Sequence, residues 1–411
     1  MAILKKMGEL AVATGMEAWL VGGLVRDLLL GVGAGDLDVV VEGDGLEFAR
    51  KASRELGANL IEYERFLTAT LQFPDLIRVD IATARTETYE HPGSLPRVVR
   101  ATVMDDMRRR DISINAMALS ITGGKFGELF DPFGGAGDLA GKTVRVLHDR
   151  SFLDDPTRIL RAARFEARFG FTMDPHTLEL LRGAVAGGAL ESISADRLRE
   201  ELFLAFVEHD PGAVFARLGE LGVLADIVPG ADPGGDLPRL LHDALLVSGL
   251  VEKGKEWDPA VLGLLLLVRG IPPEKSARLA DRLKLNADGR RALSMAGELP
   301  EIAHIAGSSA MSGLHGHLGH APLEVKLAVL VMMEDENSRR MLIEYLRQGR
   351  VARPEISGDD LLAMGYARGP VLKRILDALL VEKLDGRVHT RGEEEEFVRN
   401  NFNPPDGEAV A

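Results

Sequence analysis

The apolar pattern of this chain changes near residue 150, and that change limits the folds open to it. Up to about residue 147, β-branched segments such as Leu37–Val41 alternate with amphipathic segments such as Gly45–Leu56. Beyond about residue 150, apolar residues recur at helical spacing, interrupted by glycine and proline. No fixed repeat period emerges there, which disfavours a solenoid. The pattern predicts an α+β fold, with a mixed sheet and helices followed by an all-helical region.

Individual elements follow from the same patterns. In the first part we expect helices at residues 1–14, 24–30 and 45–56, and strands at 18–21, 37–41, 69–72, 77–81, 113–119 and 125–129. In the second part we expect a helix from residue 156 and others at about 175–186, 194–207, 211–221, 236–251, 258–268, 273–284, 288–297, 322–334, 337–348, 358–364 and 370–382. The acidic run Glu393–Glu396 is predicted to be the solvated start of a further helix.

Composition narrows the possible chemistry. The 411 residues include no cysteine, which excludes disulfides, thiolate metal sites, iron–sulfur clusters and a cysteine nucleophile. Histidine and oxygen groups remain as metal ligands. The 49 Lys and Arg residues are outnumbered by 63 Asp and Glu residues, and the net charge is −14. Wholesale binding to nucleic acid is therefore not expected, although a local basic strip is compatible with this charge.

Targeting signals are not evident in the sequence. Lys5, Lys6, Glu9 and Glu17 interrupt any apolar signal-peptide core. The longest strongly apolar, uncharged run is Pro259–Val268, about half of the roughly 20 residues that a membrane span needs. We therefore expect a soluble, cytoplasmic protein that has no membrane partner.

A pair of aspartates opens the second predicted strand. Alternation along a strand places Asp36 and Asp38 on one face, where two carboxylates repel each other unless cations lie between them. Mg²⁺ prefers oxygen ligands of this kind together with substrate phosphates. The alternative is a turn at the start of a strand, with Asp36 capping and Asp38 solvated. Asp80, on another predicted strand, is either a third carboxylate that acts as general base or an ordinary salt-bridge partner.

A glycine turn precedes this pair by about ten residues. Gly22 and Gly23 join a predicted strand to a predicted helix, and paired glycines let a phosphate approach the backbone. Arg26 falls in the first turn of that helix, within reach of a phosphate oxygen. Taken alone, such a pair of glycines is most often just a tight turn. Beside two aspartates, it predicts a phosphate cradle and a metal pair at one end of a sheet.

Two later segments are rich in arginine. Arg108–Arg110 precede Asp111 and Asn115, a combination suited to phosphate and ribose contacts, because guanidinium groups bind phosphate bidentately. A solvated charge run is the alternative, but this one adjoins an apolar segment.

The second arginine-rich segment begins with Asp154 and Asp155. Asp155 is able to cap a helix that has Pro156 at its first position, and this is the structural alternative. On that helix Asp155 and Arg158 share a face, as do Arg158 and Arg161. An acceptor beside a donor matches the amino group and ring nitrogen of cytosine and adenine, whereas guanine and uracil present the reverse order. The spacing therefore predicts selection of C and A.

Together these segments resemble the bacterial-type, class II tRNA nucleotidyltransferase and poly(A) polymerase family of polymerase-β-like nucleotidyltransferases. The resemblance covers residues 18–205. It rests on VGGLVRD with DLDVVV, RRDISINAMAL, FDPFGGAGDLAGKTVRVL, DDPTRILRAARF and the neck-like ISADRLREEL. Residues 356–370 also resemble the family's tail.

The resemblance implies both an organisation and roles. A nucleotidyltransferase head would span residues 1–147, a base-selecting neck 148–207, a helical body 208–300 and a tRNA-binding tail 301–411. Asp36 and Asp38 would be the catalytic ligands of Mg²⁺. The nucleotide would be held by Gly22, Gly23, Arg26, Arg109, Arg110, Asp111 and Asn115, its base would be selected by Asp155 and Arg158, and Arg161 and Arg164 would support it.

The implied reaction adds C, C and A to the tRNA 3′ end. CTP and ATP would be the substrates, the acceptor arm of tRNA the partner, and no nucleic-acid template would be used. Departures from the family pattern at Asp154, Ile112 and Ser113 are mild. The segment Ala84–Pro96, however, resembles the form seen in A-adding relatives, so A-only addition, CC-only addition and poly(A) synthesis remain alternatives.

Other readings have weaker support in the sequence. Gly135–Thr143 approximates a P-loop, but Ala136 falls where the first glycine is required. A non-catalytic RNA-binding helical protein would not need the aspartate pair, and a small-molecule nucleotidyltransferase would not need the long helical region. His242 and Asp243 resemble a phosphohydrolase pair without its other ligands. The four histidines His304, His315, His317 and His320 lack metal-site spacing and predict a flexible loop or solvated turn.

Overall fold

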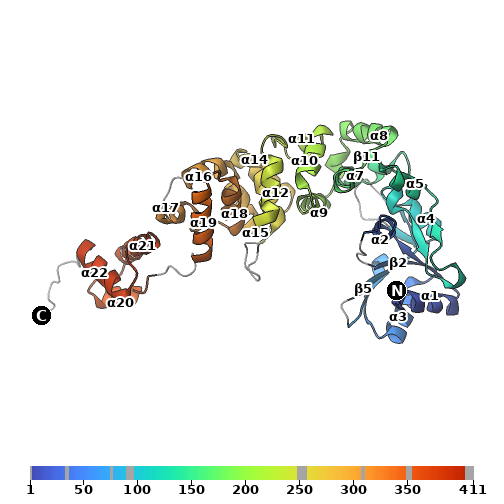
Figure 1. The fold of residues 1–411 in the computed structure, drawn as a ribbon, viewed down its shortest axis with the longest axis horizontal. Helices are drawn as coiled ribbons and strands as arrows, with labels where there is room; N and C mark the ends of the chain where they lie inside the picture. The colour runs from blue at the N-terminus through green and yellow to red at the C-terminus, as the bar shows by residue number, and fades with distance from the viewer. Residues whose placement is uncertain are drawn as a thin grey trace. The chain divides into compact units, whose positions relative to one another are not determined.

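The structure is a computed structural model that describes residues 2–32, 37–74, 77–88, 97–247, 257–306, 311–348 and 354–402 (Figure 1). The chain divides into two compact units, residues 1–229 and 230–411. Each unit is described by itself below. None of the helices in these ranges is long and apolar enough to cross a lipid bilayer.

A seven-stranded mixed sheet organises the first unit, with strand order β3-β4-β5-β2-β1-β8-β9. Its strands are β1 Glu17–Val21, β2 Leu37–Glu42, β3 Asn59–Tyr63, β4 Thr68–Gln72, β5 Arg78–Thr83, β8 Ala118–Ser120 and β9 Leu129–Phe130. A separate antiparallel pair is formed by β6 Arg85–Thr88 and β7 Arg97–Arg100. In the large sheet only β2 and β5 pair in parallel, while the other pairings are antiparallel among the described strands.

Helices cover both faces of the sheet. One face is covered by α1 Ala2–Ala13 and α3 Gly45–Leu56, which contact β1 and β3–β5. On the other face, Val103 and Met107 of α4 Val103–Arg108 pack with Trp19 and Val40. Because side chains alternate along a strand, Asp38 projects to the same face as Val40. The residues that follow α4 in the chain therefore lie on the face of the sheet that carries Asp38.

Helical elements follow within the first unit. They are α2 Gly23–Leu29, α5 Gly135–Ala140, α6 Ser151–Asp154, α7 Thr157–Phe169, α8 Pro175–Ala186, α9 Ala195–Phe206, α10 Pro211–Glu220 and α11 Val223–Ile227. A short parallel pair, β10 Thr143–Val144 and β11 Thr172–Met173, joins the region before α6 to the end of α7. The helix α7 packs against α9 and α10.

The second unit is helical throughout its described residues. Its α-helices are α12 Leu237–Val247, α13 Pro259–Leu267, α14 Pro273–Arg282, α15 Ala287–Ser294, α16 Leu299–Ala306, α17 Met311–Leu318, α18 Leu323–Met332, α19 Glu336–Gln348, α20 Gly358–Ala363, α21 Pro370–Leu384 and α22 Arg391–Asn401. The helix α13 is apolar on all sides and is buried from Ala260 to Leu267, packed by α12 and α18. The last three helices share their own cluster, which includes Leu361, Ile375 and Val398.

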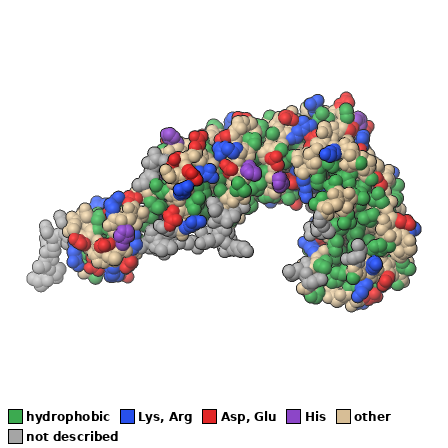
Figure 2. Space-filling view, in the orientation of Figure 1, with side chains coloured by type: hydrophobic (Ala, Val, Ile, Leu, Met, Phe, Trp, Pro, Cys, Tyr) green, Lys and Arg blue, Asp and Glu red, His purple; other side chains and the backbone are tan. Residues whose placement is uncertain are grey.

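Charged residues on the second unit are of mixed sign. On the face shown in Figure 2, Lys and Arg side chains are interspersed with Asp and Glu over these helices. The local basic strip that the sequence allows is therefore not assigned to particular residues of this unit.

Several predictions from the sequence need correction. Ser113–Asn115, expected to begin a strand, forms a 3₁₀ turn, and the strand β8 begins only at Ala118. The segment 125–129 contributes only Leu129 to a strand.

The histidine-rich segment also differs from its prediction. The sequence predicts a flexible loop or solvated turn, but His304 lies on α16, and His315 and His317 lie on α17. Only His320 lies in a turn, as predicted. His315 Nδ1 is 2.9 Å from the Tyr345 hydroxyl of α19. The other three histidines are therefore surface and packing residues of helices.

The acidic run near the C-terminus is only partly solvated. Thr390 caps α22 through a capping box with Glu393, as a helix start requires. Glu394, by contrast, is fully buried and accepts hydrogen bonds from Lys383 Nζ at 2.7 Å and from the backbone N–H groups of Glu355 and Ile356. The acidic run thus provides a buried ion pair between α22 and α21 as well as a solvated surface.

Candidate active site

A glycine corner joins β1 to α2. Gly22 has φ 73° and ψ −140°, a conformation that residues with a Cβ atom rarely adopt. A Cβ atom built on Gly22 would lie 2.8 Å from Nη1 of Arg110, and one on Gly23 would lie 3.1 Å from Nη2 of Arg26. The two glycines therefore let two guanidinium groups approach the backbone at the start of α2.

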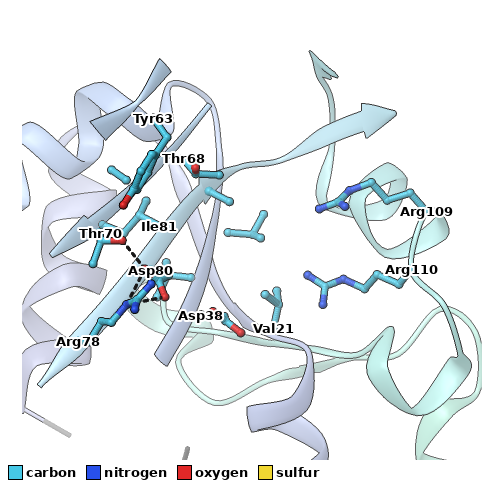
Figure 3. A pocket seen from close by; sticks show the side chains of 14 residues that line it. Val21, Asp38, Tyr63, Thr68, Thr70, Arg78, Asp80, Ile81, Arg109 and Arg110 are labelled. Carbon is cyan, nitrogen blue, oxygen red and sulfur yellow. Dashed lines mark hydrogen bonds and ion pairs between the residues drawn. The ribbon is translucent and has the colours of Figure 1, made fainter. Parts of the chain in front are cut away.

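Two carboxylates lie side by side on the neighbouring strands. In the parallel pairing of β2 with β5, Asp38 is the register partner of Asp80. In Figure 3, Asp38 is seen between Asp80, which is bonded to Arg78 and Thr70, and the guanidinium groups of Arg109 and Arg110. Asp36, the other member of the predicted pair, lies outside the described residues. The acidic partner that the structure does describe beside Asp38 thus comes from a different strand.

The carboxylate of Asp80 also contacts side chains of β4 and β5. Thr70, its register partner on β4, donates a hydrogen bond from Oγ1 to Asp80 Oδ1 at 2.5 Å. Arg78 donates to the same oxygen from Nε and Nη2, both at 3.1 Å. The sequence left Asp80 open between general base and salt-bridge partner, and the structure gives it an ion pair beside Asp38.

Two pockets meet at Asp38, Arg109 and Arg110. The first, which we call the arginine pocket, has a volume of about 490 Å³ and is lined by Gly22, Gly23, Arg26, Asp38, Arg109, Arg110, Asp111, Asn115, Asp155, Arg158, Arg161, Arg164, Phe165 and Arg168. The second, the strand pocket, has a volume of about 370 Å³ and extends over β4 and β5 to Asp80, Thr70 and Tyr63. Every described site residue predicted from the sequence lines one of these two pockets.

The charge of the arginine pocket is opposite to that of the whole chain. Seven arginines and three aspartates line it, a formal excess of four positive charges in a chain of net charge −14. Such an enclosure attracts a compact polyanion, because its cations are concentrated on low-dielectric walls. Arginine forks also match the geometry of phosphate oxygens.

Asp106 fixes the two arginines that both pockets share. It is fully buried, and its Oδ1 accepts hydrogen bonds from Arg109 Nε at 3.0 Å and Nη2 at 2.7 Å. Its Oδ2 accepts from Arg110 Nη2 at 3.1 Å. A second contact of Arg110 runs from Nη1 to the carbonyl of Asn115 at 3.3 Å. The orientation of both guanidinium groups is thus set by protein contacts.

A chain of buried polar groups forms the floor of the arginine pocket. Arg26 Nη1 donates to Asn115 Oδ1 at 2.6 Å, and Asn115 Nδ2 donates to Asp111 Oδ1 at 3.0 Å. Arg161 donates from Nε and Nη2 to Asp111 Oδ2 at 2.9 and 2.7 Å. Burial would raise the pKa of Asp111, but Arg161 and the hydrogen bond from Asn115 outweigh it, so the pKa lies below its ordinary value. Burial lowers the pKa of Arg26.

The predicted base-selecting pair lies at the entrance of α7. Asp155 Oδ1 accepts from the backbone N–H of Thr157 at 3.2 Å, a capping contact, and α7 begins at Thr157. Arg158 donates to Ser151 Oγ at 2.8 Å and to the carbonyl of Arg109 at 2.6 Å. Both side chains line the arginine pocket and are buried. The first turn of α7 is therefore hydrogen-bonded to the backbone of Arg109, one of the two arginines that both pockets share.

The helix α9 supports α7 from behind. Glu201 pairs with Arg161 at 3.1 Å and with Arg164 at 3.2 Å, and Phe165 lies between three guanidinium groups of this region. Arg197, one turn earlier on α9, donates from Nη2 to Asp155 Oδ2 at 2.7 Å. Ion pairs of both polarities thus join α9 to α7 and to Asp155, which precedes it.

Sequence reasoning missed several of these residues. Phe165 and Arg168 lie inside a motif that it singled out, and helical spacing from Arg161 and Arg164 would have found them. Asp106 stands three and four residues before Arg109 and Arg110, and the same helical spacing would have found it. Thr70, Arg197 and Glu201 act through contacts between different elements, for which the sequence contains no local signal. The neck-like segment ISADRLREEL was noted, but without a role for Arg197 or Glu201.

The alternatives raised by the sequence gain no support. In the P-loop-like segment, the N–H groups of Gly135 and Ala136 donate to the carboxylate of Asp131, and these residues line neither pocket. Asp243 pairs with Arg239 on the surface of α12.

The acidic row, formed by Asp38 and Asp80 on neighbouring strands, is chemically suited to a divalent cation. No group of three or more potential ligands of the His, Asp and Glu type occurs in the described part of the chain. Mg²⁺, however, is commonly bound by one or two carboxylates together with water and substrate phosphates. Asp38, in register with Asp80 and lining a pocket for a polyanion, fits the carboxylate part of that donor set.

Comparisons with known proteins identify relatives of this chain. Residues 18–145 match the model of the Poly A polymerase head domain, and residues 170–234 match that of a probable RNA and SrmB-binding site of polymerase A. An A-adding tRNA nucleotidyltransferase of Halalkalibacterium halodurans is 33% identical over 98% of this chain and 92% of the relative. Another from Geobacter sulfurreducens is 35% identical over 96% of this chain, which spans only 46% of that relative's length.

A solved structure is similar over nearly the whole chain. The Thermotoga maritima CCA-adding enzyme complexed with tRNA is 31% identical, with a TM-score of 0.78 over 98% of this chain and 95% of that one. The glycine corner, Asp38 and Arg109–Asn115 fall within the residues matched by the head-domain model, whereas Asp155–Arg168 lie between the two matched ranges. The chain therefore belongs to the tRNA nucleotidyltransferase and poly(A) polymerase family.

Proposed function

We propose that this chain transfers nucleotides from a nucleoside triphosphate to the 3′ end of tRNA and releases pyrophosphate, without a nucleic-acid template. The observation that carries the proposal is the arginine pocket, which combines a glycine corner with a formal excess of positive charge and opens at Asp38 into a second pocket. A triphosphate suits the first pocket. The 3′-terminal nucleoside of an RNA suits the second.

In this proposal each group has one task. Arg109 and Arg110, oriented by Asp106, neutralise the triphosphate, while Asn115 and Asp111 contact the ribose. Asp36 and Asp38 hold Mg²⁺, and Asp80 accepts the proton of the attacking 3′-hydroxyl. Bound Mg²⁺ supplies charge stabilisation at the attacking and leaving oxygens of such a transfer.

Base selection is proposed to come from Asp155 and Arg158. An ionised carboxylate only accepts hydrogen bonds, and a guanidinium only donates them. The pair therefore complements an amino group beside an unprotonated ring nitrogen, the arrangement found in cytosine and adenine. Arg161 and Arg164 support the nucleotide from the same helix. Residues 1–147 would then be the head, 148–207 the neck, and 208–300 and 301–411 a body and tail that bind the acceptor arm.

Among the possible products we favour addition of A to tRNA that already ends in CC. Support comes from the two relatives named above as A-adding, which match 96% and 98% of this chain. Complete CCA addition is the second candidate, favoured by the name of the T. maritima structure.

One assay separates these possibilities. The purified chain is given Mg²⁺ and tRNA transcripts that end before the first C, after one C, or after CC, each with labelled CTP or ATP. Incorporation of ATP only, on the CC-ended transcript, is expected for A addition. Incorporation of CTP on the two shorter transcripts as well would establish complete CCA addition. No incorporation on any transcript would refute the proposal.

A further inference from the structure

We infer that Arg197, on α9, is a positioning residue for base choice: its ion pair keeps Asp155 an unprotonated, fixed hydrogen-bond acceptor, so that the site takes bases with an amino group. This inference rests on the proposed function, because it requires that Asp155 faces the base of the incoming nucleotide. It assigns a role to a residue that lines neither pocket.

The contacts of Asp155 are shared between its two oxygens. Oδ1 accepts from Thr157 Oγ1 at 2.7 Å and from the backbone N–H of Thr157. Oδ2 accepts from Arg197 Nη2 at 2.7 Å, and the same nitrogen reaches Thr157 Oγ1 at 3.1 Å. Each carboxylate oxygen has two lone-pair directions, so Oδ2 retains one for a base. Arg197 therefore orients the carboxylate without using up its capacity to accept.

The environment would otherwise favour the protonated acid. Asp155 is 8% exposed, and burial raises the pKa of a carboxyl group. The charged groups that face it are Arg197 from α9 and Arg158 from α7, the helix that follows it. Although burial would raise the pKa of Asp155, the hydrogen bonds from Arg197 and Thr157 outweigh it, and the pKa is lowered. Removing Arg197 takes away the first of these opposing contacts.

Protonation would change which bases fit. A protonated carboxyl group becomes a donor and accommodates the carbonyl oxygen of uracil or guanine in place of an amino group. Arg158 still opposes the N–H group on the ring of these bases, so one of the two contacts relaxes. Loss of Arg197 should therefore admit UTP and GTP in part, and more so at low pH, where the carboxyl group is protonated.

The test compares Arg197→Met with Arg197→Lys, which keeps the charge, and with Arg182→Met, which removes an exposed arginine from α8. Single-turnover incorporation of ATP, GTP and UTP into CC-ended tRNA is measured from pH 6 to pH 8. For Arg197→Met we expect the ratio of UTP and GTP to ATP incorporation to rise severalfold over that of the original chain, and in this variant the ratio should fall from pH 6 to pH 8 as less of the carboxyl group is protonated. Arg197→Lys and Arg182→Met should keep the selectivity of the original chain.

A uniform fall in the incorporation of all three nucleotides, with unchanged ratios at every pH, would show that Arg197 is only structural and would overturn the inference. Thermal unfolding establishes that the variants fold. If Arg197→Met does not fold, Arg197→Gln, which also lacks the charge, takes its place under the same criteria.

Asp155→Asn separates the role of Asp155 from that of Arg197, because it should relax base choice independently of pH. If Asp155→Asn leaves selectivity intact, the proposed base-selecting role itself fails. If it relaxes selectivity while the charge-removing Arg197 variant does not, only the role of Arg197 fails.

Discussion

Asp38 and Asp80 face each other across the only parallel strand pairing described in the large sheet. Adjacent strands lie about 4.8 Å apart, so the two carboxylates are neighbours although they are distant in sequence. Two acids at this separation destabilise each other unless positive charge is close, and Arg78, Arg109 and Arg110 line the same pocket.

Replacement of Asp38 should abolish transfer and leave the fold intact. Asp38 is exposed at the end of a strand whose next three residues are buried, so its loss removes a ligand and not a core contact. We expect Asp38→Ala to lower kcat by roughly a thousandfold, in the range seen when a charge-stabilising group is removed. Incorporation of ATP and thermal unfolding are measured in parallel, with Glu64→Ala, an exposed acid on the same unit, as the control. Turnover near that of the original chain would refute the assignment of Asp38 as a metal ligand.

The role of Asp80 can be separated from its ion pair. If Asp80 accepts the proton of the attacking hydroxyl, Asp80→Asn should lower kcat by about 10²-fold or more, the size of a general-base contribution. Thr70→Val, which removes only the 2.5 Å hydrogen bond to Asp80, should have a smaller effect. Pre-steady-state incorporation measured against pH distinguishes the two. A normal rate for Asp80→Asn would leave Asp80 as the partner of Arg78 alone.

The glycine corner predicts a difference between two glycine variants. Gly22 and Gly15 have similar positive φ angles, 73° and 67°, so an alanine at either is strained by about 1–3 kcal/mol. Only at Gly22 would the new Cβ atom also displace Arg110, since nothing lies within 4 Å of the corresponding atom at Gly15. Gly22→Ala should therefore raise KM for ATP severalfold more than Gly15→Ala does at a comparable loss of stability. Equal KM values would contradict a contact between this corner and the nucleotide.

Acid should weaken the ion pair between Asp111 and Arg161 of α7. The pKa of Asp111 is lowered in the folded chain, so this ion pair contributes stability above the ordinary carboxyl pKa of about 3.9. The contribution is lost as the pH falls below that value. Asp111→Asn leaves Arg161 without this buried partner and should cost about 3 kcal/mol at neutral pH.

Urea unfolding from pH 3 to pH 7 provides the measurement. The variant should show a shallower loss of stability with acid than the original chain. Asp149→Asn, at an exposed ion pair with His176, serves as the control. Parallel pH profiles of Asp111→Asn and the original chain would argue against the contribution of Asp111.

The sequence predicts the periodic elements of this fold well. The helices α3 and α8 begin and end at the predicted residues, because their apolar positions repeat at helical spacing and Asp44 and Asp174 cap them. The motifs also converge as expected, since a strand, a glycine turn and a helix leave little freedom for the side chains between them.

Other features depend on contacts that no local pattern encodes. Residues 116–119 are apolar and suggest a strand that starts at Ser113, but Asn115 is hydrogen-bonded to Arg26 and Asp111, and Ser113–Asn115 forms a 3₁₀ turn instead. The edge strand β3 has a weak alternating pattern and was not predicted. The pairing of Arg197 with Asp155 joins residues on different helices and follows only from how α9 packs against α7.

Strand registration has a consequence for how this chain tolerates insertions. Extra residues between β2 and β5 leave the acidic row intact as long as they enter the connecting loops. A single residue inserted within either strand, upstream of the buried valines, would turn one aspartate to the opposite side of the sheet, beneath the helices, and separate the carboxylates. Length variation among homologues should therefore be confined to the connections, even where the strand sequences themselves diverge.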